Sequence, residues 1–178
     1  MDRIRILQGD ITRMEVDCIV NAANSSLLGG GGVDGAIHRA AGPELVHECR
    51  LLGGCKTGQA KLTKGYNLQA TYIIHTVGPY YRDGKSGESD DLTSCYRHSL
   101  ELAVDHQIRT IAFPCISTGI FRYPFDEAAT IALKTISSFL ENNDSLELVT
   151  LVCFSENDFA RFVELSHDPE NWARGGEG

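Results

Sequence analysis

Long apolar runs are absent from the sequence, and no stretch approaches the roughly 20 consecutive apolar residues that a membrane-spanning helix needs. The first residues, Met1–Leu7, include two arginines but neither a long apolar segment nor a small-residue cleavage site. They therefore differ from a secretory signal. We expect a cytoplasmic location and no association with a membrane.

Positive charge is also scarce, since the chain has 16 Lys and Arg residues but 24 Asp and Glu residues, and its formal net charge is −8. Proteins that hold a nucleic-acid backbone neutralise its phosphates with Lys and Arg. Direct binding of DNA or RNA is therefore not expected. If the ligand is an anion, backbone N–H groups and helix N-termini must supply much of the binding.

The six cysteines are scattered, and no two of them form a Cys-x-x-Cys pair. In a cytosolic chain this spacing argues against a zinc site and against a disulfide framework. We expect buried free thiols, and neither a metal nor a cofactor.

Several short segments are continuously apolar or β-branched, a pattern typical of strands that are covered on both faces. The length of 178 residues and the hydrophobic fraction of 42% suit one globular domain. We expect strands at Arg5–Gln8, Asp17–Asn21, Tyr72–Val77, Thr110–Pro114 and Leu148–Phe154, with a weaker edge strand at Ala60–Thr63.

Apolar residues at helical spacing lie between these strands. Asp91 is expected to cap one long helix after a surface loop at Lys85–Asp90, and Pro124 to be the first residue of another. Strands alternating with helices predict an α/β fold, a three-layer α/β/α sandwich with its ligand site beyond the carboxyl ends of the strands. Shorter helices are expected at Asp34–Ala41, Pro43–Leu51 and Asn157–Leu165.

Four consecutive glycines, Gly29–Gly32, follow the strand Asp17–Asn21 and precede a helix expected to start near Asp34. Bare backbone N–H groups beside a helix N-terminus predict a phosphate cradle; the alternative is a flexible surface loop. Gly30, Gly32 and Gly35 satisfy the dinucleotide fingerprint only formally, because the loop is long and the helix is interrupted early. The triphosphate-binding motif is absent, since no Gly-Lys-Ser/Thr occurs.

Two polar side chains, Asn24 and Asp34, bracket the glycine loop. In the structural interpretation, Asn24 satisfies the backbone of a local turn and Asp34 stabilises a helix N-terminus. In the functional interpretation, Asn24 orients a ligand hydroxyl and Asp34 contacts the reacting sugar or a water. A helix N-terminus would favour ionised Asp34, which suits a base.

A second loop with anion-binding character follows the strand Thr110–Pro114. Ser117, Thr118 and Gly119 offer hydroxyl and backbone donors beside the start of the next helix. Two such loops at neighbouring strand ends predict a diphosphate held from both sides.

Other candidate residues have structural alternatives of their own. Phe121 covers a sugar or packs on the helix, and Phe154 stacks on a base or closes the core. His38 and His75 are expected to be structural, because one lies in a short helix and the other in an apolar strand. Cys115, at a strand end, is expected to pack rather than act as a nucleophile.

These segments resemble, in sequence and in order, macrodomains of the MacroD type, a group that includes bacterial O-acetyl-ADP-ribose deacetylases. The resemblance implies a macrodomain at residues 1–167 with a mixed, largely six-stranded sheet between helices, and a flexible tail at residues 168–178. It extends from about Ile6 to about Phe162 and rests on Gln8–Thr12, Val20–Asn24, Gly29–Gly42, His75–Pro79 and Pro114–Gly119.

The resemblance also implies roles for individual residues in binding ADP-ribose. Asp10, with Ile11 beside it, would accept a hydrogen bond from the adenine amino group, and Asn24 would position the distal ribose. Asp34 would be the catalytic acidic residue. Gly32 and Val33 would supply backbone contacts, and Phe154 would lie near adenine. The residues that would wrap the diphosphate and the distal ribose are Ser117, Thr118, Gly119, Ile120 and Phe121.

The chemistry that the resemblance implies is hydrolysis of an ester on the distal ribose, without a metal. The substrates would be O-acetyl-ADP-ribose and proteins mono-ADP-ribosylated on Asp or Glu. Asp34 would be the general base for water, or would position the sugar while a ligand phosphate activates the water. The alternatives are an ADP-ribose reader without catalysis and a regulator that binds an unidentified protein partner; a poly(ADP-ribose) glycohydrolase would need adjacent glutamates that are missing here.

Arg122 departs from the family pattern, in which glycine commonly follows the aromatic residue of the second loop. Glycine adopts backbone conformations that arginine disfavours. We predict that Arg122→Gly changes the affinity for ADP-ribose or the rate of ester hydrolysis. An unchanged binding constant together with an unchanged rate would show that Arg122 has no influence on the loop.

Overall fold

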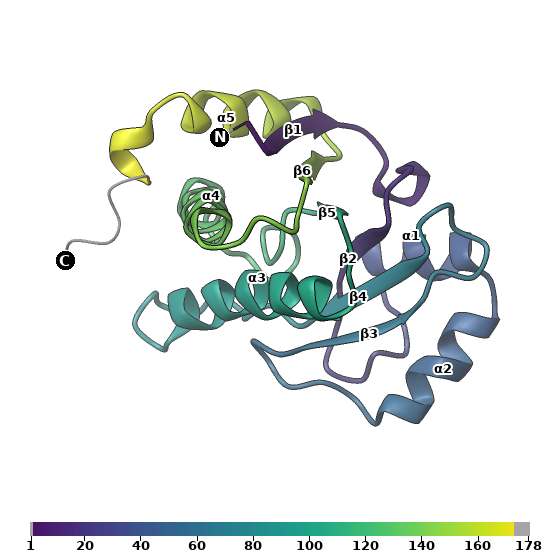
Figure 1. Cartoon of the computed structure of the whole chain (residues 1–178). Helices are drawn as coiled ribbons and strands as arrows, with labels where there is room; N and C mark the ends of the chain where they lie inside the picture. Colours follow the sequence, from purple (N-terminus) through teal and green to yellow (C-terminus); the bar gives the residue numbers. More distant parts are fainter. Residues whose placement is uncertain (1, 173–178) are drawn as a thin grey trace.

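Six strands form one sheet in the computed structural model, which describes residues 2–172 (Figure 1). The strand order is β1-β6-β5-β2-β4-β3, and every neighbouring pair is parallel except the antiparallel pair β3 and β4. The expected weak strand is thus an edge strand. The bounds are Ile4–Gln8 (β1), Cys18–Ala22 (β2), Ala60–Lys64 (β3), Tyr72–Thr76 (β4), Thr110–Phe113 (β5) and Leu148–Cys153 (β6).

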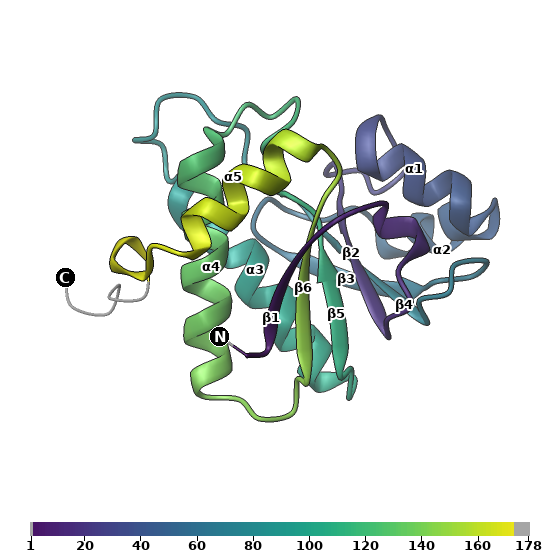
Figure 2. The ribbon, with the colours of Figure 1, turned by 90° about the horizontal axis from the view of Figure 1, so that it is seen from above.

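Helices cover both faces of this sheet, with α1 and α2 on one face and α3, α4 and α5 on the other (Figure 2). The predicted three-layer α/β/α sandwich with a mixed sheet is therefore confirmed. Within residues 2–172, no helix has the length and apolar character that crossing a membrane requires. The helices are Gly32–Ala41 (α1), Glu44–Leu52 (α2), Glu88–Asp105 (α3), Phe125–Glu141 (α4) and Glu156–Ser166 (α5), with short 3-10 turns at Ile11–Arg13 and Pro169–Asn171.

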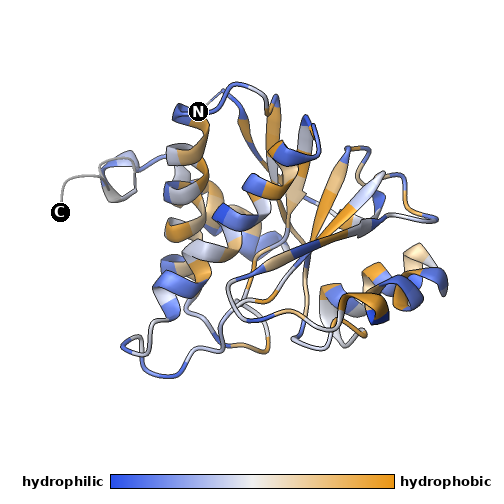
Figure 3. Cartoon of the chain, turned by 60° about the horizontal axis from the view of Figure 1, so that its bottom comes forward, coloured by the Kyte–Doolittle hydropathy of each residue, from blue (hydrophilic) through white to orange (hydrophobic). Residues whose placement is uncertain are grey.

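Burial on both faces explains why the strands are continuously apolar. In β2, Cys18 and Val20 pack against the α3–α4 side, whereas Ile19 between them packs against the α1–α2 side. Successive side chains of a strand point to opposite faces, so a covered sheet needs an apolar residue at every position. Figure 3 shows hydrophobic residues along the strands and hydrophilic residues on the outer sides of the helices.

Several helix starts differ from the sequence expectation. Helix α3 begins at Glu88, three residues before Asp91, so the expected loop at Lys85–Asp90 is wrong for its second half. Pro124 precedes α4 in an extended conformation, with ψ of 129°, and is not its first helical residue. Helix α1 starts at Gly32, which places Asp34 in its first turn.

The early start of α3 results from the buried carboxylate of Glu88, which is 3% exposed. It accepts hydrogen bonds from the backbone N–H groups of Arg82 (2.9 Å), Asp83 (3.1 Å), Gly84 (2.9 Å) and Ser86 (2.6 Å). These hydrogen bonds lower the pKa of Glu88 to about 2. An acidic residue that sequence analysis assigns to a solvated loop therefore folds the loop around itself.

The packed chain continues beyond the boundary expected at residue 167. Trp172 is 2% exposed and belongs to the core on the α3–α4 side. Its indole N–H donates to the carbonyl of Leu165 at 3.2 Å. The first part of the expected flexible tail thus leads back into the core, and its remainder, residues 173–178, lies outside the described residues.

We predict that Glu88→Gln lowers the thermal midpoint by several degrees at neutral pH. Both carboxylate oxygens of Glu88 accept from backbone N–H groups, and glutamine replaces one of them with an NH2 group that cannot accept. The folded pKa lies below the ordinary value, so the carboxylate stabilises the fold above pH 4.5, and this contribution falls as the pH drops towards about 2. The difference between the two proteins should therefore shrink in acid. The exposed Glu101→Gln on the same helix is the control, and equal midpoints for both variants would contradict this role of Glu88.

Candidate functional site

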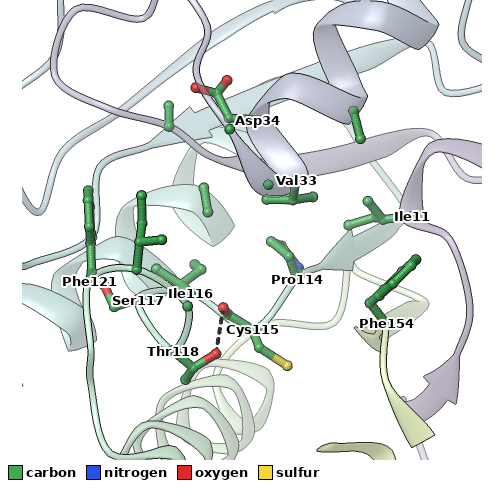
Figure 4. Close-up of a pocket in the computed structure, with 18 of the residues that line it drawn as sticks. Ile11, Val33, Asp34, Pro114, Cys115, Ile116, Ser117, Thr118, Phe121 and Phe154 are labelled. Carbon is green, nitrogen blue, oxygen red and sulfur yellow. Dashed lines mark hydrogen bonds between the residues drawn. The ribbon is translucent and has the colours of Figure 1, made fainter.

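Loops that follow the carboxyl ends of the parallel strands line a cavity of about 700 Å³ (Figure 4). Because β1, β2, β5 and β6 are parallel neighbours in the sheet, the segments after them meet at one edge. The structure brings together all the residues that sequence analysis assigned to the site. These are Asp10, Ile11, Asn24, Gly32, Val33, Asp34, Ser117, Thr118, Gly119, Ile120, Phe121 and Phe154.

The glycine loop lies against the first turn of α1. A Cβ on Gly30 would stand 3.1 Å from Oδ2 of Asp34 and 3.2 Å from Nδ2 of Asn24. A Cβ on Gly35 would stand 2.5 Å from the carbonyl oxygen of Gly30. A side chain at Gly35 would clash with this backbone oxygen, and one at Gly30 would crowd the two polar side chains. The side-chain atoms of Asn24 and Asp34 thus both lie close to Gly30.

Asp34 is 5% exposed, in the first turn of α1. Its Oδ1 accepts a hydrogen bond from Nδ2 of Asn21 at 2.9 Å, and Nε2 of His38 lies 3.4 Å from the same oxygen. Burial raises the pKa of Asp34, and the Asn21 hydrogen bond and His38 lower it by less. The helix N-terminus was expected to keep Asp34 ionised, but the pKa of Asp34 is raised, because the effect of losing water is larger. A raised pKa makes the carboxylate a stronger proton acceptor than that of an exposed Asp.

Asn24 holds the local turn, as the structural interpretation expects, and it also lines the cavity. Its Nδ2 donates to the carbonyl of Gly29 at 2.8 Å. Its Oδ1 accepts from Oγ of Ser26 at 2.6 Å and from the backbone N–H of Leu27 at 3.2 Å. The amide nitrogen has a second hydrogen and lies beside Gly30 at the cavity wall.

The second loop lies across the cavity from Val33 and Asp34 (Figure 4). The hydroxyl of Ser117 donates to the carbonyl of Pro79 at 2.9 Å, and that of Thr118 donates to the carbonyl of Cys115 at 3.2 Å. In the structure both hydroxyls therefore donate to backbone carbonyls and hold the loop. Backbone N–H groups are the donors that this loop can offer to an anion.

Arg122 follows in the left-handed region, with φ of 64°. The strain expected for an arginine at a position suited to glycine is thus present in the loop. The backbone on either side is fixed by hydrogen bonds, from Arg122 N–H to Gly119 O at 3.0 Å and from Tyr81 N–H to Phe121 O at 2.8 Å.

The adenine side predicted for the cavity combines an acceptor with an aromatic ring. Oδ1 of Asp10 accepts from the backbone N–H and the hydroxyl of Thr12, at 2.9 and 2.7 Å, and these bonds lower the pKa of Asp10. Phe154 is 85% exposed, so the interpretation that it closes the core is wrong. Phe121 packs its ring against Tyr80, with 5.3 Å between the centroids.

Sequence analysis missed the polar residues beneath the site. Asn21 is fully buried in β2, yet it supplies the hydrogen bond to Asp34. An asparagine inside an otherwise apolar strand is the signal that could have identified it, because a buried amide needs partners. Arg39 of α1 also lines the cavity. Among residues 2–172, no three His, Cys, Asp or Glu side chains converge in a way that could hold a metal ion.

Comparisons with known proteins agree with this geometry. A family profile described as "Macro domain" matches residues 20–132. A "Macro domain-containing protein" of Methanosarcina mazei is 60% identical over 157 residues, which cover 88% of this chain and 84% of that protein. The human "ADP-ribose glycohydrolase MACROD2" is 54% identical over 160 residues, 89% of this chain but 38% of that protein.

Two solved structures with high similarity contain ADP or ADP-ribose. The Oceanobacillus iheyensis macrodomain with ADP superposes with a TM-score of 0.88 at 47% identity, covering 91% of this chain and 88% of that one. The Trypanosoma brucei macrodomain in complex with ADP-ribose gives a TM-score of 0.87 at 44% identity, covering 92% and 69%.

We predict that Asp34→Asn raises the thermal midpoint at neutral pH by a few degrees, because it removes a carboxylate whose charged form is disfavoured by burial. The folded pKa exceeds the ordinary 3.8, so ionisation costs stability increasingly as the pH rises from 3.8 through the folded pKa. The gain should be larger at pH 7 than at pH 4. The exposed Asp144→Asn is the control, and a pH-independent difference would contradict the assignment.

Proposed function

This chain belongs to the macrodomain family, and we propose that it binds ADP-ribose and hydrolyses an ester on the distal ribose. Its substrates are O-acetyl-ADP-ribose and proteins that carry a single ADP-ribose on Asp or Glu. The observation that carries the proposal is that Asn24 and Asp34 both lie close to Gly30 at the wall of the cavity.

The cavity suits a nucleotide diphosphate that carries a second sugar. Phe154 and Ile11 flank the adenine, and Asp10, whose pKa is held below its ordinary value, accepts from the adenine amino group. The diphosphate lies between Gly32–Val33 and the second loop, where backbone N–H groups compensate for the negative net charge of the chain. This arrangement brings the distal ribose to Asn24 and Asp34.

Hydrolysis then needs one water and one proton acceptor. The water oxygen bonds to the acyl carbon, the bond from that carbon to the ribose oxygen breaks, and the ribose oxygen leaves as a hydroxyl. Asp34 takes the proton from the water and returns one to the ribose oxygen, which contributes roughly 10²–10⁴-fold to the rate. In the alternative route, a phosphate of the ligand activates the water and Asp34 positions the sugar. Neither route draws on a metal ion.

Relatives support hydrolysis over simple binding. Proteins of human, frog and cow named ADP-ribose glycohydrolase MACROD2 or MACROD1 are 52–58% identical to this chain. Within this family, a module that only reads ADP-ribose has no need of a buried carboxylate with a raised pKa. The six free cysteines suit the cytoplasmic location that we propose.

The test is turnover of two esters, a Glu-linked mono-ADP-ribosylated protein and O-acetyl-ADP-ribose, by the native chain and by Asn24→Ala and Asp34→Ala. Calorimetry measures ADP-ribose binding to all three, and Asp144→Ala, away from the cavity, is the control. We expect fast turnover by the native and control proteins, a loss of roughly 10²-fold or more in Asp34→Ala, and persistent binding in at least one site variant. Tight binding by the native chain without turnover of either ester would leave an ADP-ribose reader instead.

A further inference from the structure

A chain of buried polar side chains runs from the edge strand β3 to the carboxylate of Asp34. Oγ1 of Thr63 lies 2.8 Å from Nε2 of His75, and Nδ1 of His75 lies 3.1 Å from Nδ2 of Asn21. The same nitrogen of Asn21 donates to Oδ1 of Asp34 at 2.9 Å. Thr63, His75 and Asn21 are each 0% exposed, so these contacts are shielded from bulk solvent.

The contacts of Asn21 determine which nitrogen of His75 carries a proton. Nδ2 of Asn21 is only a donor, so Nδ1 of His75 must accept and its proton must be on Nε2. Nε2–H then donates to the hydroxyl of Thr63, which in turn donates to the carbonyl of Lys64 at 3.2 Å. The other neighbour of Nε2 is Sγ of Cys49 at 4.0 Å. When His75 is neutral, each donor in this series of hydrogen bonds faces an acceptor.

Burial maintains this neutral state. Loss of water and the charge of His38 lower the pKa of His75 to about 3. The His38 and His75 rings lie close together, with centroids 6.4 Å apart, so a proton on both would be unfavourable. The imidazole is therefore an uncharged hydrogen-bond relay at neutral pH.

The amide of Asn21 has only one favourable orientation. Rotating it by half a turn would place its oxygen beside a carboxylate oxygen of Asp34, where two acceptors would repel each other. As oriented, its two hydrogens serve both acceptors, while its oxygen is buried without a partner among residues 2–172. Leaving the amide oxygen unpaired destabilises the fold, and this cost is offset by a fixed position for the nitrogen.

We propose that His75 is a positioning residue for Asp34, acting through Asn21 as an acceptor that fixes the amide. This inference rests on the proposed ester hydrolysis at Asp34. With Asn21 held between His75 and Asp34, the carboxylate is anchored through Oδ1 and its Oδ2 stays beside Gly30 at the cavity. Without the acceptor on His75, the amide is free to rotate and the carboxylate loses its anchor. Thr63 supports the relay by selecting the Nε2–H form.

The first test is nitrogen NMR of the histidines in the native, ligand-free protein at pH 7. Long-range proton–nitrogen spectra distinguish the protonated ring nitrogen from the unprotonated one. We expect a proton on Nε2 of His75 and none on Nδ1. A proton on Nδ1, alone or together with one on Nε2, would overturn the proposal, because Nδ1 could not then accept from Asn21.

The second test uses two substitutions of nearly equal shape, His75→Asn and His75→Leu. The side-chain oxygen of asparagine reaches the place of Nδ1 and can accept from Asn21, whereas leucine offers no acceptor. We expect His75→Leu to lower kcat by roughly tenfold to a hundredfold with little change in ADP-ribose affinity. His75→Asn should recover most of the rate. Equal kcat values for the two variants would overturn the proposal, since packing alone would then explain the residue.

If the His75 variants do not fold, two smaller substitutions at Thr63 test the same relay. Thr63→Val removes the acceptor for Nε2–H, and Thr63→Ser keeps it. We expect kcat to fall in Thr63→Val and to stay near native in Thr63→Ser, and equal rates would count against the relay. Absence of turnover in the native protein would refute the proposed function, whereas a Nδ1 proton in a protein with normal turnover would refute the positioning role alone.

Discussion

The close approach of Gly30 to the first turn of α1 is the contact on which the shape of the site depends. Its carbonyl oxygen occupies the space that any side chain at Gly35 would need, and its own Cα faces the polar atoms of Asn24 and Asp34. A loop without side chains can therefore cover a buried carboxylate without filling the cavity above it. The glycines combine two roles, since the same bare backbone can also face phosphate oxygens.

Burial of Asp34 is the second constraint, and it lowers the stability of the folded protein when the carboxylate is charged. A carboxylate removed from water is tolerated when its oxygens are hydrogen-bonded. Here one oxygen is held by Asn21, which belongs to the central strand β2 and not to the helix that carries Asp34. The acidic residue is thus tied to a strand in the middle of the sheet. Its raised pKa and its fixed position have the same origin, because both follow from enclosure between α1 and β2.

Sequence patterns predicted the layers of the fold, the edge strand and the two loops that line the cavity. These features follow from local apolar patterning and from the rule that parallel strands end at one edge. Asp10, Ile11 and Ile120 were assigned to the site only through the resemblance to macrodomains. Patterns could not predict the pKa direction of Asp34, the early start of α3 at Glu88, or the inward use of the Ser117 hydroxyl. Each of these depends on partners distant in sequence or on loop geometry. The relay through His75 could not be predicted for the same reason. Thr63 and Asn21 come into contact with His75 only when β3, β4 and β2 lie side by side.

The claim that water attacks the acyl carbon is tested most directly by oxygen-isotope labelling. A single turnover of a Glu-linked mono-ADP-ribosylated protein is carried out in water enriched in the heavy isotope of oxygen, and the glutamate side chain of the product protein is analysed by mass spectrometry. Our account predicts one heavy oxygen atom in the side-chain carboxylate. An unlabelled carboxylate would contradict it, because the bond broken would then be the one between the ribose carbon and the ester oxygen.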